Sequence, residues 1–105
     1  MAQWDVYVNP SARMRDALPY VVVVQSDLLE QLDTRLVAPL ARSKQARKGL
    51  PPRLSPRFEI KGESLELVMQ ECAPLPARAL HEPVASLRSA SHRIVDAIDT
   101  VISGV

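Results

Sequence analysis

Few side chains in this 105-residue sequence have the types and spacing that catalysis or metal binding requires. His81 and His92 lie eleven positions apart and Cys72 is the single cysteine, so the spacing matches no zinc pattern. A hydrolase could use Ser26 and Asp27 beside a histidine, but a Ser-Asp step before two leucines is more typical of a cap or turn. We therefore expect no catalytic residue, no metal and no cofactor.

The glycines and the composition exclude further classes of function. The three glycines are scattered, so they form neither a phosphate-binding loop nor a dinucleotide fingerprint. With 47% hydrophobic and 24% charged residues and a net charge of +1, the chain is typical of one soluble domain over residues 1–105. Such a charge gives no general attraction to nucleic acid or membranes. The single cysteine, and an N-terminus without a signal-peptide pattern, predict a cytoplasmic protein.

One basic segment could serve as a binding surface. From Arg42 to Arg57 the chain has six basic residues, no acidic residue and three prolines, which favours a loop with one helical turn over residues 43–48. The segment has no aromatic residue for base stacking, so we expect no direct binding of nucleic acid. Two interpretations remain: a solvated basic loop, or a surface that attracts an acidic protein partner.

The N-terminal half contains three sequence patterns typical of β-strands, and these strands would hold any binding surface in place. Residues 4–8 alternate in character, which predicts a strand with its even-numbered residues on one apolar face. Residues 20–24 are continuously apolar and mostly β-branched, which predicts a central strand covered on both faces. Residues 35–38 predict a short strand that ends at Pro39.

The C-terminal half predicts a hairpin followed by a helix. Residues 57–60 and 64–70 alternate around Lys61-Gly62, a two-residue turn in which the glycine supplies a positive φ. Residues 77–80 predict a short edge strand. From Pro83, which suits the first turn of a helix, apolar residues recur at helical spacing. They are Val84, Leu87, Ile94, Ile98, Val101 and Val105.

This order of elements predicts a mainly β fold with a C-terminal α-helix, in which a compact barrel carries the helix on its surface. The apolar stripe continues to Val105, although chain ends normally fray in water. Together with the strand at residues 21–24, the helix offers more apolar surface than so small a barrel needs. We therefore predict a homodimer.

The order of several short segments resembles the CcdB family of toxins. Val24-Gln25-Ser26-Asp27-Leu28-Leu29 resembles the family's V-Q-S-D-I-I/L-L stretch, and Arg35-Leu36-Val37-Ala38-Pro39-Leu40 resembles its R-R-x-V-I-P-L strand. The Asp5-Val6-Tyr7 opening, the Gly62-Glu63-Ser64 hairpin and the ending in Gly-apolar are also similar. The resemblance covers essentially the whole chain.

The resemblance implies an SH3-like barrel that forms a two-fold dimer and acts by binding proteins rather than by catalysis. Family toxins enter between the two A subunits of DNA gyrase and trap the complex on cleaved DNA. A CcdA antitoxin neutralises them through a disordered segment that folds on the dimer.

Carried over position by position, the resemblance implies two sets of binding residues. The gyrase-binding set is Leu28, Leu29, Asp99, Ile102, Ser103, Gly104 and Val105. The antitoxin-binding set is Leu28 and Leu29, to which the basic segment adds Arg42, Lys44, Arg47 and Lys48.

The sequence departs from the family at one of these positions. Toxic members end in aromatic-Trp-Gly-Ile, and their paired tryptophans clamp an arginine of gyrase, whereas this chain has Ser103 in place of the tryptophan. A serine has no indole face to offer a guanidinium, a contact worth up to about 2 kcal/mol when it is desolvated.

Two alternatives to a gyrase toxin stay open. A MazF-like endoribonuclease shares the barrel and the dimer, and would need an arginine with an acidic or histidine partner. Arg13, Arg35 and Glu30 are present, but no MazF-like pattern surrounds them. The other alternative is a non-toxic CcdB relative that only binds antitoxin and regulates its operon.

Overall fold

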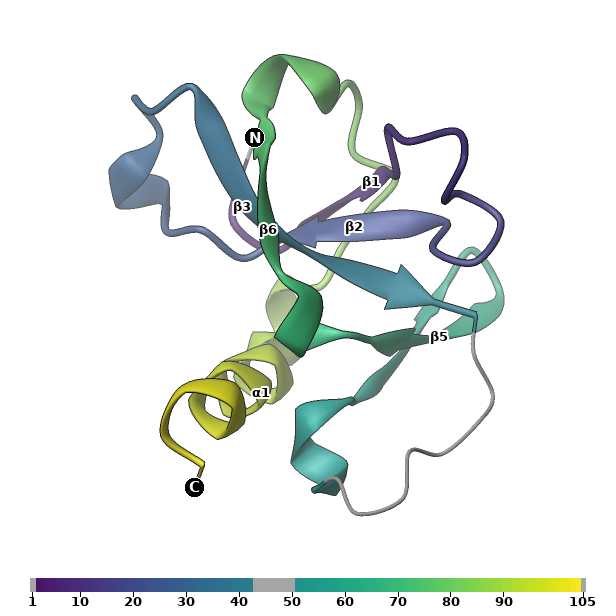
Figure 1. Ribbon diagram of the computed structural model, residues 1–105, viewed down its shortest axis with the longest axis vertical. Coiled ribbons are helices and arrows are strands. Elements are labelled where there is room, and N and C mark those ends of the chain that lie inside the picture. Colours follow the sequence, from purple (N-terminus) through teal and green to yellow (C-terminus); the bar gives the residue numbers. More distant parts are fainter. Residues whose placement is uncertain (1, 43–50, 105) are drawn as a thin grey trace.

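The longest strand, β3 (Thr34–Ala41), organises the sheet in the computed structural model, which describes residues 2–42 and 51–104 (Figure 1). One edge of β3 pairs with β2 (Tyr20–Val23). Beyond β2 lie β1 (Asp5–Val8) and then β7 (Ala85–Ser86).

The other edge of β3 has two partners in succession. Its first half pairs with β6 (Ala73–Pro76), and its last two residues pair with β5 (Glu63–Leu67). Outside β5 lies β4 (Arg57–Ile60). The described strands therefore form one antiparallel sheet that curls into a nearly closed barrel, and α1 (Ser91–Ser103) packs on it (Figure 1). The predicted fold class, mainly β with a C-terminal helix, is confirmed.

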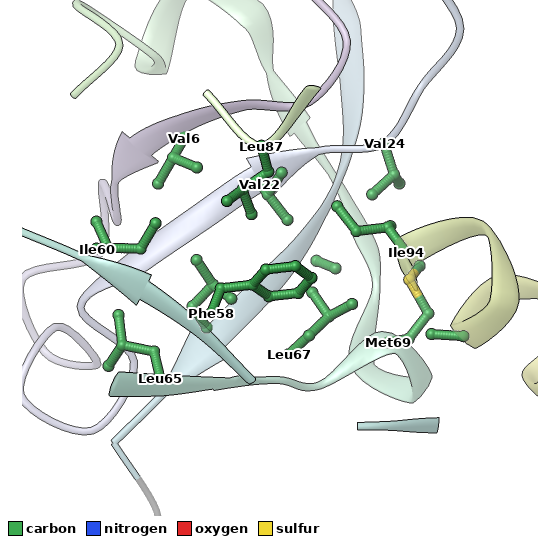
Figure 2. Close-up of a cluster of buried hydrophobic side chains, with 13 residues drawn as sticks. Val6, Val22, Val24, Phe58, Ile60, Leu65, Leu67, Met69, Leu87 and Ile94 are labelled. Carbon is green, nitrogen blue, oxygen red and sulfur yellow. The ribbon is translucent and has the colours of Figure 1, made fainter. Parts of the chain in front are cut away.

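The main hydrophobic core lies between the sheet and α1. Figure 2 shows side chains from β1, β2, β4, β5 and α1 converging around Phe58. Ile94 is the largest helix side chain in this core and is completely buried. A second, smaller cluster of Tyr7, Val21, Val23, Val37 and Leu80 covers the opposite face of the sheet. The prediction that β2 is covered on both faces is therefore confirmed.

This two-sided burial contradicts the single apolar face predicted for the first strand. Val6 and Tyr7 point to opposite faces, and both are buried, whereas Val8 is 44% exposed. Trp4 lies before the strand, because its backbone has a φ of 77°. The alternation of apolar and polar residues could not indicate which side chains are buried here, because a hydrophobic cluster covers each face of the sheet.

Pro39 does not end its strand, as the sequence had predicted. β3 continues to Ala41, and Pro39 pairs with Val21 of β2. The backbone carbonyl of Leu36 points towards β2, since it accepts a hydrogen bond from the N–H of Val24. The nitrogen of Pro39 then points to the other edge, where β3 changes partner from β6 to β5. A missing N–H at such a break removes no ladder bond.

The edge strand of the C-terminal half lies at residues 73–76 rather than at residues 77–80. Pro74 pairs with Leu36, whose backbone points away from β6, so the nitrogens of Pro74 and Pro76 face outwards. These prolines leave the outer edge of β6 without N–H donors at those positions, which protects it against addition of another strand. Residues Ala77–Ala79 form a 3-10 turn, η4.

The helix starts at Ser91, eight residues later than the prediction of Pro83. The intervening backbone is used by the sheet, because Val84 N–H donates to Val6 O (2.8 Å) and Leu87 N–H donates to Trp4 O (2.9 Å). Leu87 still belongs to the main core. No helix within the described residues is long and apolar enough to cross a membrane.

The predicted hairpin is confirmed, but its second strand, β5, ends at Leu67 rather than at residue 70, and Met69–Glu71 form a 3-10 turn, η3. Lys61 and Gly62 connect β4 to β5 with φ values of 54° and 80°, and Phe58 pairs with Leu65 across the two strands. The helical turn predicted for residues 43–48 lies outside the described residues.

Candidate functional site

An apolar groove of about 340 Å³ lies between the turn after β2 and the C-terminal half of α1. The turn contributes η1 (Asp27–Leu29), and the floor comes from β3 and from η3 (Met69–Glu71). Most of its lining residues are apolar. The groove is lined by Val24, Gln25, Ser26, Leu29, Leu36, Met69, Cys72, Ile98, Val101 and Ile102, of which Gln25 and Ser26 are polar.

Polar side chains fix the turn that forms one wall of the groove. The Ser26 hydroxyl accepts a bond from the N–H of Leu28 (3.1 Å), and Asp27 accepts one from the N–H of Gln3 (2.9 Å). The Gln25 amide accepts from the N–H of Leu36 (2.9 Å). Ser26 therefore caps η1 as predicted, whereas the Asp27 carboxylate binds the backbone of the distant residue Gln3.

Arg35 also stabilises the chain that follows this turn. Its guanidinium donates to the backbone carbonyls of Glu30, Leu32 and Thr34. The endoribonuclease alternative required an arginine with an acidic or histidine partner, but the hydrogen bond of Arg35 to Glu30 is to the backbone carbonyl oxygen. In the described part of the chain, no three histidine, cysteine or acidic residues are grouped to hold a metal ion.

Large apolar side chains around the groove are exposed to solvent. Leu28 is 92% exposed, Ile102 is 80% exposed and Leu29 is 49% exposed. Contiguous apolar surface of this kind is typical of protein-binding sites. The groove and its rim can therefore bury a partner's apolar residues without any rearrangement of the core.

The helix end beside the groove is closed by local hydrogen bonds. Gly104 adopts a left-handed conformation with φ 74°, and its N–H donates to Thr100 O (3.1 Å). Only glycine takes up this conformation without strain. The Ser103 hydroxyl donates to Asp99 O (2.7 Å). The Gly104 bond satisfies the carbonyl of Thr100, one of the four that the last turn of a helix leaves without partners.

The CcdB protein family model matches residues 3–104, which include the turn, the groove and the helix end. The chain belongs to the CcdB family. No curated protein matches the chain. Membership of the CcdB family supports a toxin of a toxin–antitoxin system.

The structure brings together some of the residues that the CcdB resemblance had singled out. Leu29 and Ile102 both line the groove, one from the turn after β2 and the other from α1, and Leu28 adjoins Leu29 on the exposed turn. Asp99, Ser103 and Gly104 are exposed at the helix end. Val105 lies outside the described residues.

Sequence analysis had not assigned several groove residues to a site. Leu36 was interpreted only as part of a strand, although it is 37% exposed and lies on the groove floor. Val101 and Ile98 were assigned to the apolar stripe of the helix, and this stripe was the one sequence feature that could have indicated their place in the groove. Nothing in the sequence around Cys72 indicated that it would line the groove.

The structure gives Arg42 an internal role. Its guanidinium donates to both carboxylate oxygens of Glu63 and to the backbone carbonyl of Asp16 (2.7 Å). The hydrogen bond to Glu63 raises the pKa of Arg42. Arg42 thus links β3 to the hairpin turn, and antitoxin binding through it stays a prediction. Lys44, Arg47 and Lys48 lie outside the described residues.

Proposed function

We propose that this CcdB-family protein is the toxin of a type II toxin–antitoxin system and that it binds the A subunit of DNA gyrase as a homodimer. It acts by trapping the gyrase–DNA complex, without a catalytic residue of its own. A CcdA-like antitoxin neutralises it.

The observation that carries this proposal is the shared groove of Leu29 and Ile102. Both residues occupy positions that the family resemblance assigns to gyrase binding, and both are substantially exposed beside one apolar cavity. A surface of this type favours burial of a protein partner over chemistry on a small substrate. The Ser26 hydroxyl accepts a hydrogen bond from a backbone N–H, and the Arg35 guanidinium donates to backbone carbonyls.

Homodimer formation is proposed on the same surface argument. Leu36 and Val101 expose apolar area within the groove, and Leu28 exposes more beside it. A second copy that covers part of this area would bring two helix ends together, and the gyrase-binding surface would then be formed by both subunits.

Three measurements test the proposal together. Induced expression should arrest bacterial growth, and the purified protein should bind an A-subunit fragment of gyrase in a calorimetric titration. In a supercoiling assay it should accumulate cleaved DNA. Growth arrest without gyrase binding would contradict the assigned target, whereas RNA cleavage by the purified protein would contradict the non-catalytic mechanism.

A non-toxic CcdB relative is the second candidate, and one observation favours it. Ser103 presents a hydroxyl bound to Asp99 O where toxic members present an indole. Such a protein would bind antitoxin and regulate its operon without harming the cell. Normal growth on expression, together with tight antitoxin binding, would support this candidate over the toxin.

A further inference from the structure

A second surface of the protein is formed by arginines from two separate elements. Arg53 belongs to η2 (Pro52–Leu54), and Arg93 belongs to the first turn of α1, against which η2 packs. Together with Pro52, Pro56 and Asp96 they line a pocket of about 230 Å³, which we call the arginine pocket.

The guanidinium of Arg93 is held in place before any ligand arrives. It lies over the ring of Phe58, 4.5 Å from the ring centroid, and its Nη2 donates to the carbonyl oxygen of Arg57 (2.7 Å). Among the described residues, nothing else accepts a hydrogen bond from Arg93, and nothing pairs with Arg53. An arginine fixed by stacking loses little side-chain freedom when it binds, which favours binding.

The two guanidiniums determine which ligand chemistry fits the pocket. A planar guanidinium binds a carboxylate through two parallel hydrogen bonds. Nucleic acid is a poorer match, because Phe58 is buried beneath Arg93 and offers no face for base stacking. Asp96 also places a negative charge in the pocket, which opposes a carboxylate and a phosphate alike.

We propose that the arginine pocket is a docking site for an acidic segment of a partner protein, with a carboxylate bound between Arg53 and Arg93. The prolines at positions 52 and 56 give the pocket rigid apolar walls for the rest of that segment. That the segment belongs to the antitoxin rests on the proposed function, whereas the carboxylate site itself does not.

The arginine pocket is separate from the groove. The two share no lining residue. An α-helix turns by about 100° per residue, so Arg93 and Asp96 lie on the side of α1 opposite to Ile98. A segment in the pocket therefore does not cover the groove directly.

The test is a titration of the isotope-labelled full-length protein with a short capped peptide of alternating glutamate and serine. A matching glutamine–serine peptide is the neutral probe, and backbone amide NMR shifts both locate the binding and give its affinity. We expect the acidic peptide to shift amides around Arg53 and Arg93, with an affinity that falls as salt is added.

Three variants make the test specific to the pocket. Arg53→Gln should weaken binding about two- to fivefold, the range of exposed ion pairs, and Asp96→Asn should strengthen it by a similar factor. Arg88→Gln removes the same charge from an exposed arginine outside the pocket and should change little.

Several outcomes would overturn the proposal. Equal weakening by Arg53→Gln and Arg88→Gln would show that binding follows net charge rather than the pocket. Equal binding of the acidic and neutral peptides would show that the pocket does not bind carboxylates. Tighter binding of duplex DNA, with shifts of the same backbone amides, would show that it binds phosphate instead. None of these experiments uses gyrase. The arginine pocket can therefore be disproved without affecting the proposed function, and the proposed function can be disproved without affecting the pocket.

Discussion

Leu29 and Ile102 face the same groove, one from the turn after β2 and the other from the last turn of α1. Neither side chain is needed to fill the core, since they are 49% and 80% exposed. Such exposed apolar side chains add little to the packing of the core, which favours a role in binding.

Replacing Leu29 with Ser should weaken gyrase binding and relieve growth arrest without unfolding the protein. The change removes apolar contact area from the groove, while a half-exposed position costs about 0.5 kcal/mol or less of the free energy of unfolding. Calorimetric titration and urea unfolding measure the two effects. Leu32→Ser is the matched control, because Leu32 is 52% exposed nearby but does not line the groove. Equal losses in both variants would contradict a specific role for the groove.

Replacing Ser103 with Trp should strengthen gyrase binding. Ser103 is exposed, so the larger side chain requires no repacking of the core. A stacked cation contributes up to about 2 kcal/mol per site, and two sites in a dimer could raise affinity about a thousandfold. The measurement is a titration of the gyrase A-subunit fragment with both proteins. Tight binding by the wild type that tryptophan does not improve would show that the interaction needs no aromatic group.

The protein should sediment as a dimer at micromolar concentration. Leu36 and Val101 line the groove and are both partly exposed, and pairing would remove such apolar surface from water. Analytical ultracentrifugation checks the mass, and Val101→Asp should shift the equilibrium towards the monomer if α1 is at the interface. A wild-type monomer at this concentration would contradict the proposed homodimer.

Replacing Ile94 with Ala should destabilise the fold by about 2–5 kcal/mol, because the side chain is completely buried and its removal leaves a cavity. Ile94→Val should cost about 0.5–1.5 kcal/mol, which keeps the experiment informative if the alanine variant does not fold. Urea unfolding followed by circular dichroism provides the values. Val95→Ala is the control on the neighbouring exposed position, 42% exposed, and should change the free energy of unfolding little.

Tyr7 should reduce the stability of the protein at alkaline pH. Burial, followed by the nearby charge of Asp5, raises the pKa of Tyr7 above its ordinary value of 10.0. The unfolded chain therefore releases this proton first, so the stabilisation is fully present below pH 10.0 and is lost as the pH rises towards the folded pKa. Tyr7→Phe should flatten this part of the pH dependence, as measured by urea unfolding at neutral and alkaline pH. Identical slopes for both proteins would contradict it.

Much of the fold could be predicted from local patterns. The hairpin around Lys61 and Gly62, the buried β2 strand and the helical stripe through Ile94 and Ile98 all follow from residues close together in the sequence. Side-chain periodicity and turn chemistry are local properties, so the sequence by itself determined the mainly β order and the terminal helix.

Other features depended on contacts between distant segments, and only the tertiary structure decided them. The helix begins at Ser91 because β1 takes the hydrogen bonds of Val84 and Leu87, and β3 passes through Pro39 because its edge changes partner there. The groove arises where the turn after β2, β3 and α1 meet. Which backbone groups pair, and which apolar faces are left uncovered, are set by the packing of whole elements, and no local pattern specifies them.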